Sequence, residues 1–118
     1  MARHVEPGAK PLPPSVFHIL LALQDGEQHG YAIMRGVEDL TDGAVVMGPG
    51  TLYGSIKRML ADGLIEETAE RPDPALDDER RRYYRVTAAG AKARAAEVAR
   101  MQSLLRSAGA AVPRLGKA

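Results

Sequence analysis

One stretch of the chain, residues 48–66, combines an apolar helical face with a polar face suited to phosphates. Thr51, Ser55 and Arg58 point away from the apolar face, with Tyr53 and Lys57 beside them. Small hydroxyls at a helix start, followed one turn later by Lys and Arg, suit contacts to a DNA backbone and to base edges. Taken alone, the pattern also fits an ordinary amphipathic helix. The apolar face, which would lie in a core, consists of Leu52, Ile56, Met59 and Leu60.

The residues that follow this helix favour the more specific interpretation, a recognition helix. Gly63 is placed for a left-handed cap, with Leu64 contacting Met59 as in a Schellman motif. Two short strands are predicted at residues 64–68 and 82–86, separated by a loop that contains Pro and Asp. Two strands joined by a loop after a recognition helix form a wing.

Three further helices complete the predicted order of helix, helix, helix, strand, strand, helix. Residues 14–23 are strongly apolar, and residues 31–40 carry Ile33, Val37 and Leu40 on one face. The last helix is expected at residues 87–107, because the Thr87 hydroxyl can cap its free amides.

Three separated segments at compatible spacings point to a known family. They are His29-Gly30-Tyr31-Ala32-Ile33, Gly50-Thr51-Leu52-Tyr53 and Arg82-Tyr83-Tyr84-Arg85-Val86-Thr87. Through them the chain resembles the PadR family of bacterial transcriptional regulators, from about Ser15 to about Arg94. The chain departs from the family at Gly54, where Pro is frequent, and at residues 72–79, where an acidic insertion replaces a short basic wing tip.

The resemblance implies a mainly α fold with a small two-stranded β-wing, a winged helix-turn-helix followed by a C-terminal dimerisation helix. It also implies a DNA-binding transcriptional regulator, interpreted as a repressor that binds a palindromic operator in double-stranded DNA as a homodimer. Relatives commonly respond to small aromatic effectors at the dimer centre. The alternative is a winged-helix protein interaction module without specific DNA binding. The expected organisation is a flexible arm at residues 1–14, a DNA-binding domain at 15–87, a dimerisation helix at 88–108 and a flexible tail at 109–118.

Residues expected to contact DNA lie at the starts of the second and third helices, on the outer side of the third, and where the wing returns. A phosphate contact by Tyr31 follows from the resemblance, the alternative being a core position. Seven acids between Glu66 and Glu79 would repel phosphates, so the wing tip is expected to stay away from DNA. The expected contacts are Tyr31, Pro49, Gly50, Thr51, Tyr53, Ser55, Lys57, Arg58, Arg80, Arg81 and Arg82.

The last helix carries a stripe of small residues that grows into larger ones. Such a stripe would be exposed unless a partner covers it or the helix folds back onto the first helix of its own chain. In PadR-like proteins the C-terminal helix packs against the first helix of the partner subunit. Some of these residues would also line an effector pocket, although a dry core is the preferred interpretation. The expected interface comprises Phe17, Ala91, Ala95, Val98, Met101, Leu104 and Leu105.

Composition argues against other classes of protein. The net charge of +1 is too small to indicate nucleic acid by itself, so the argument rests on where the cations cluster. The chain has no cysteine, and His4, His18 and His29 lack metal-ligand spacing, so neither a metal nor another cofactor is expected. No nucleophile, base and orienting group can be assembled, which argues against an enzyme. The longest apolar run, at residues 16–23, is too short to span a bilayer, and no signal peptide precedes it, so a cytoplasmic location is expected.

Overall fold

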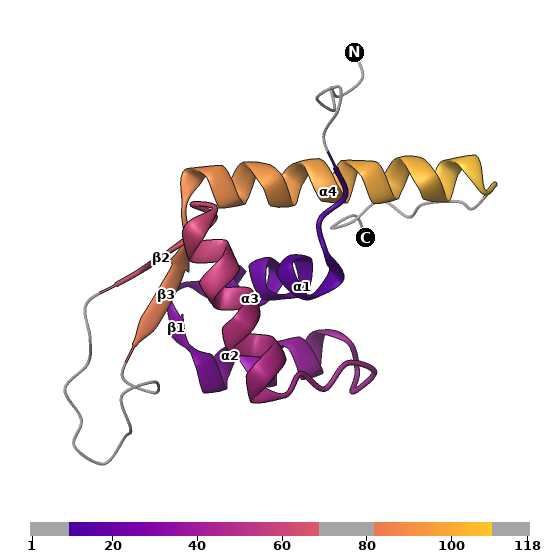
Figure 1. The fold of residues 1–118 in the computed structure, drawn as a ribbon. Coiled ribbons are helices and arrows are strands. Elements are labelled where there is room, and N and C mark those ends of the chain that lie inside the picture. The colour runs from indigo at the N-terminus through magenta and orange to yellow at the C-terminus, as the bar shows by residue number, and fades with distance from the viewer. Residues whose placement is uncertain (1–9, 69–81, 110–118) are drawn as a thin grey trace.

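The computed structural model of this chain describes residues 10–68 and 82–109, and Figure 1 shows three short helices with a small sheet at one edge and a long helix running across them. The order of four helices and two wing strands agrees with the prediction. The elements are α1 (Pro14–Ala22), the 3-10 turn η1 (Leu23–Asp25), β1 (Gln28–His29), α2 (Gly30–Leu40), α3 (Pro49–Ala61), β2 (Ile65–Glu67), β3 (Tyr83–Val86) and α4 (Ala88–Ser107).

The sheet has a third strand that the sequence pattern did not reveal. Its order is β1-β3-β2, and both pairings are antiparallel. Gln28 of β1 lies opposite Tyr84, while Ile65 of β2 lies opposite Val86. With only two residues, β1 is too short to show an alternating pattern. Through β1 the wing is joined directly to the residue that precedes α2.

The core lies where α1, α2 and α3 meet the inner side of the sheet. On β3, Tyr84 is buried while Arg85 is exposed. Leu40 departs from the prediction, because α2 ends there and its side chain is half exposed. The most deeply buried side chains come from all three helices and from β2, namely Ile19, Leu20, Ile33, Val37, Leu52, Met59 and Ile65.

Two predicted helix ends are confirmed by their hydrogen bonds. Gly63 has a φ of 75°, and the N–H of Leu64 donates to the Met59 carbonyl at 2.9 Å, as a Schellman motif requires. Thr87 Oγ1 accepts the Gly90 N–H at 3.0 Å and donates to the Gly63 carbonyl at 2.6 Å. The cap of α4 is thereby fastened to the turn that ends α3.

Residues 10–14 are ordered by contacts with the rest of the fold, although they were expected to belong to a flexible arm. Leu12 packs against the core, and its N–H donates to Glu97 of α4 at 3.2 Å. The rest of the predicted arm and most of the predicted tail lie outside the described residues. So do the acidic wing insertion and two predicted DNA contacts, Arg80 and Arg81.

Candidate nucleic-acid interface

Helix α3 presents one side to the core and the other to solvent. Gly48 precedes the helix and Pro49 occupies its first turn, where the missing N–H of proline costs no intrahelical bond. Leu52, Ile56 and Met59 are buried on the inner side. The opposite side, here called the outer face of α3, is exposed and consists of Gly50, Thr51, Gly54, Lys57 and Arg58. On this face no bulky side chain lies between the Thr51 hydroxyl and the cations of Lys57 and Arg58.

The segments that carry the family resemblance meet at the start of α2. A methyl group added at Gly30 would lie 2.3 Å from Tyr53 Oη, so the tyrosine ring rests directly on the glycine. His29 Nδ1 accepts the Ala32 N–H at 3.1 Å. The His29 ring also makes an edge contact with Tyr83, with 5.4 Å between the ring centroids. His29 therefore shapes the turn before α2.

Tyr53 and Tyr31 lie differently in this junction. Tyr53 packs against the core, so much of its ring serves the contact between α2 and α3. Tyr31 is 43% exposed in the first turn of α2. Helix N-termini favour anions, because their free N–H groups and the helix dipole point toward the ligand. Tyr31 is thus placed beside the kind of surface that a phosphate would approach.

The prediction that Ser55 points away from the core is wrong. Its hydroxyl donates to Ser15 Oγ at 3.0 Å, and the residue is half-buried against the start of α1. Ser55 follows Leu52 by three residues and precedes Met59 by four, so it lies at the edge of the buried side of α3. It contributes to the contact between α1 and α3 rather than to the outer face.

Carboxylates accompany the arginines of this region. Arg58 Nε lies 3.9 Å from Asp62 Oδ2, one helical turn further along α3. On the wing, Arg82 Nε lies 3.7 Å from Glu67 Oε2 and Arg85 Nε lies 2.6 Å from Glu66 Oε2. Exposed pairs of this kind contribute only about 0–1 kcal/mol each, so a phosphate can replace the carboxylate at little cost.

Sequence reasoning missed these pairs, although the signals were present. Asp62 stands four residues after Arg58, which is a pairing distance on a helix. Glu66 lies directly opposite Arg85 in the strand register. Lys57 differs from the arginines, since it forms no ion pair with any residue in the ranges 10–68 and 82–109.

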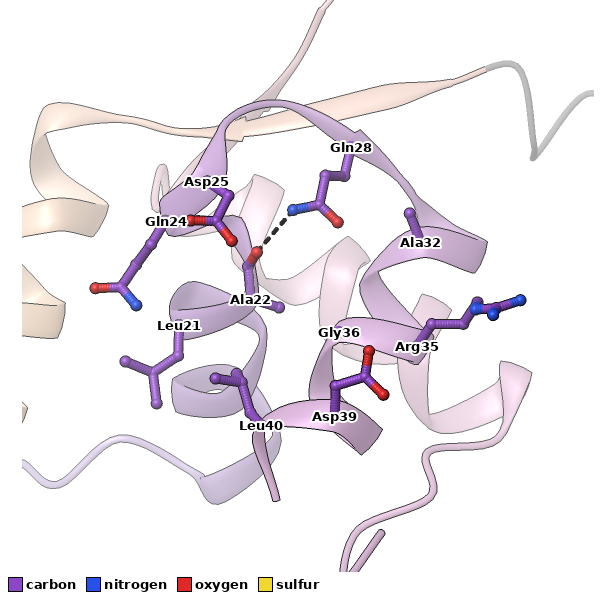
Figure 2. Close-up of a pocket in the computed structure, with 10 residues that line it drawn as sticks. All are labelled: Leu21, Ala22, Gln24, Asp25, Gln28, Ala32, Arg35, Gly36, Asp39 and Leu40. Carbon is purple, nitrogen blue, oxygen red and sulfur yellow. Dashed lines mark hydrogen bonds between the residues drawn. The ribbon is translucent and has the colours of Figure 1, made fainter. Parts of the chain in front are cut away.

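A surface cavity of about 470 Å³ lies away from the outer face of α3, between the end of α1, η1 and α2 (Figure 2). Asp25 and Asp39 line it from opposite walls, and the exposed Leu40 borders it. Gln28 Nε2 donates across its upper side to the Ala22 carbonyl at 2.7 Å. Within residues 10–68 and 82–109, its charged lining is these two carboxylates and the single cation Arg35, so it offers no net positive charge to phosphates and does not extend the candidate DNA surface.

Helix α4 behaves differently along its two halves. Its first half lies on α1 of the same chain, where Arg94 Nη1 donates to the Leu20 carbonyl at 3.2 Å and Glu97 is only 4% exposed. Its second half continues past α1 (Figure 1), and Leu104 and Leu105 are 56% and 49% exposed. Folding back, considered as an alternative, therefore holds for the first half of the helix.

The predicted interface residues are distributed over both halves of α4 and over α1. Phe17 is only 7% exposed, so it is already covered within one subunit. Ala91 and Val98 are half-buried, and Ala95 is exposed. Met101 is exposed and lies on the second half, near Leu104 and Leu105. The inner side of α4 instead centres on Gly90 and Glu97, and Glu97 was not among the residues singled out from the sequence.

These features define a winged-helix domain of the DNA-binding kind, with a recognition helix, an adjoining wing and a C-terminal helix. The sequence model described as "Transcriptional regulator PadR-like family" matches residues 19–96. The chain belongs to this family of transcriptional regulators.

Solved structures of similar fold include several transcriptional regulators. A transcriptional regulator from Clostridium thermocellum is 26% identical, with a TM-score of 0.68 over 80% of this chain and 88% of that chain. A PadR family transcription regulator from Clostridium difficile R20291 is 20% identical, with a TM-score of 0.67 over 82% and 96%. RosR of H. salinarum is 26% identical, with a TM-score of 0.58 over 86% and 81%.

One curated relative is similar over a shorter stretch. An uncharacterized 37.1 kDa protein in transposon TN4556 of Streptomyces fradiae is 40% identical over 53 residues, which span 45% of this chain and 15% of that protein. Among the residues that the structure describes, no helix has the length and apolar character needed to cross a membrane.

Proposed function

We propose that the chain is a homodimeric repressor that inserts two copies of α3 into successive major grooves of a palindromic operator. The observation that carries this proposal is the outer face of α3, where a hydroxyl and two cations surround exposed glycines on a helix whose other side is buried. Because exposed glycines leave little side-chain bulk on this face, the helix can approach the base edges closely. The two half-sites would lie about 34 Å apart, one turn of the DNA.

Contacts are assigned by the position of each residue. The start of α3 (Pro49, Gly50 and Thr51) and the exposed Tyr31 hold phosphates, because both lie at helix N-termini. Lys57 and Arg58 reach the groove, and Arg58 reads a guanine edge. Arg80, Arg81 and Arg82 at the return of the wing contact the backbone, while Tyr53 acts mainly by holding α2 against α3.

The dimer forms through the second half of α4. Met101, Leu104 and Leu105 supply an exposed apolar surface there, and Val98 continues it toward the body of the subunit. Each large apolar side chain contributes about 1.5–3 kcal/mol when fully buried. A two-fold arrangement satisfies both copies of this surface at once and accounts for the palindromic operator.

Repression follows from occupation of a promoter by the dimer in the cytoplasm. A small aromatic effector would release it by binding at the dimer centre, with Val98, Met101 and Leu105 as lining residues; Phe17, also expected there from the sequence, is covered within one subunit. Such a ligand acts only if it binds the free arrangement of the dimer more tightly than the DNA-bound one.

Selection of bound fragments from genomic DNA tests the proposal. We expect a palindrome with two half-sites, and affinity for it should fall with log salt at a slope of about 0.9 for each phosphate contact. Lys57→Ala and Arg58→Ala should each weaken binding, and Lys92→Ala, which removes an exposed cation from α4, should not. Recovery of no common sequence, with affinity indifferent to salt, would contradict DNA recognition.

The ion pairs of the arginines favour one alternative, a protein interaction module. If Asp62, Glu66 and Glu67 keep their arginines occupied, the cations would serve only solubility, and another face of the fold would bind a protein. The two hypotheses differ in the effect of removing Lys57 and Arg58. In a DNA-binding protein the loss would abolish DNA affinity, whereas in a protein interaction module it would leave binding to the protein partner largely intact.

A further inference from the structure

Helix α4 is attached to α1 by polar contacts at both ends of α1. Near the N-terminal end, Glu97 Oε1 accepts the N–H of Leu12, two residues before the helix begins, at 3.2 Å. Near the C-terminal end, Arg94 Nη1 donates to the carbonyl of Leu20 at 3.2 Å. In Figure 1 the segment that leads into α1 passes α4 at this point. Thus two side chains of α4 contact α1, Glu97 near its N-terminal end and Arg94 near its C-terminal end.

The signs of these two charges match the dipole of α1. A helix is stabilised by a negative charge at its N-terminus and a positive charge at its C-terminus. Helix α1, which the structure describes throughout, has no acid in its first turn and no base in its last, and no side chain caps its start. Glu97 and Arg94 of α4 place groups of the matching sign at the two ends of α1, although Arg100 shares the charge of Glu97.

Glu97 is held firmly in its position. It is the one charged residue buried within the described part of the chain. Arg100 donates to both of its carboxylate oxygens, from Nε at 3.1 Å and from Nη2 at 2.5 Å. The hydrogen bond from Arg100 lowers the pKa of Glu97 below its usual value against the effect of burial, and the Leu12 N–H lowers it further.

These contacts are directional, whereas the apolar contacts beside them are small. The inner side of α4 near Glu97 offers alanines, Ala93 and Ala96, which alone would let one helix slide over the other. A shift of α4 would separate the buried Glu97 carboxylate from the Leu12 N–H, its one donor among the described residues outside α4, and losing a hydrogen bond to a buried charge is costly. The polar contacts therefore fix the direction and the register of α4 on α1.

We propose that Glu97 and Arg94, with their partners Leu12, Leu20 and Arg100, form a clamp that sets the operator spacing that the dimer accepts. The inference rests on the proposed dimer, since the partner would sit on the second half of α4. Residue 107 lies about 15 Å along the helix axis from Glu97. A rotation of about 13° at the clamp would therefore move the partner by about 3.4 Å, one base-pair step. Glu97 and Arg94 are positioning residues in this account, and neither touches DNA.

The test uses the full-length chain and a set of operators that differ only in spacer length. The wild-type protein should bind one spacer at least about tenfold more tightly than spacers one or two base pairs longer or shorter. Glu97→Leu and Arg94→Met should reduce this preference to about threefold or less, while sedimentation still shows a dimer. Arg94→Met is the milder variant, because it removes one hydrogen bond and leaves no buried charge unpaired. Glu38→Gln, which changes an exposed acid of α2, should leave the preference unchanged.

Hydrogen exchange supplies a readout that does not depend on DNA. The Leu12 amide and the amides of residues 93–100 should exchange faster in Glu97→Leu than in the wild-type protein. Unchanged exchange, or a spacer preference that both variants retain, would overturn the clamp. A wild-type dimer that binds all spacers equally would also overturn it. A wild-type protein that is monomeric would instead refute the proposed dimeric repressor, and the exchange of Leu12 would then show only whether the contact between α4 and α1 exists.

Discussion

The contact between Gly30 and Tyr53 allows a direct test of how α2 is held against α3. A Cβ at residue 30 would lie 2.3 Å from Tyr53 Oη, 2.8 Å from Cζ and 3.0 Å from Cε1, whereas ordinary contacts begin at 3.4 Å. The ring would have to withdraw by about 1 Å. It packs against the core and is carried by a helix, so it has little freedom to do so.

The expected magnitude follows from two opposing effects. Overpacking of this kind costs about 1–3 kcal/mol. Replacing glycine by alanine in a helix contributes about 0.5–1 kcal/mol in the other direction, and less at a first helical position. Gly30→Ala should therefore lower the free energy of unfolding by about 1–2 kcal/mol. In a Tyr53→Ala background the clash is absent, and the same substitution should be neutral or slightly stabilising.

Urea unfolding followed by circular dichroism measures both effects in a double-mutant cycle. All variants are compared at one protein concentration, because dimerisation would make stability concentration-dependent. The cycle should give a coupling energy of about 2 kcal/mol between residues 30 and 53. Gly54→Ala is the matched control, since a methyl there meets nothing within 4 Å. It should raise the free energy of unfolding by about 0.5–1 kcal/mol.

The reasoning fails if Gly30→Ala has the same effect with and without the Tyr53 ring. That result would show that the ring moves aside at no cost, and that the glycine serves some purpose other than the approach of α2 to α3.

Three further predictions concern the charge, the acid stability and the assembly of the protein. Asp62→Asn should raise DNA affinity about threefold to tenfold, because it frees Arg58 and removes a charge that repels phosphate, while stability changes little; unchanged affinity in a filter-binding assay would place Arg58 off the DNA. Because the pKa of Glu97 is lowered in the folded protein, its stabilising contribution is present above the unfolded pKa of about 4.3 and is lost as the pH falls below it, so acid titration of the wild-type protein should show a loss of stability that is smaller in Glu97→Gln. Val98→Glu with Leu105→Glu should give monomers by sedimentation and weaken operator binding, and a variant that stays dimeric would move the interface elsewhere.

The sequence sufficed for the helices because their signals are local. Leu52, Ile56 and Met59 repeat at helical spacing, and the cap residues Gly63 and Thr87 act within a few positions of themselves. The pairing of β1 with β3 could not be read in this way. It joins residues 28 and 84, and a strand of two residues has no period.

The sequence predicted most residues of the candidate site, but not which other residues of the chain they contact. Thr51, Lys57 and Arg58 are exposed on α3 as expected, whereas Ser55 faces Ser15, forty residues earlier in the chain. The burial of Glu97 was not predicted either, because its contact is also distant in the sequence. An acid within a run of alanines and arginines looks solvated in sequence, and only the approach of Leu12, eighty-five residues away, explains its burial.

The paired arginines bear on how such a protein would tell one DNA sequence from another. With a net charge of +1, and with Arg58, Arg82 and Arg85 each beside a carboxylate, the described surface offers little unbalanced positive charge to DNA in general. Non-specific binding depends on that charge, so it should be weak. A matching operator lets the low outer face of α3 approach the bases, and phosphates can then displace carboxylates whose pairing is worth only about 0–1 kcal/mol each. Under this account the acids raise the ratio of specific to non-specific binding, because they penalise every site while only the operator supplies the base contacts that offset the cost.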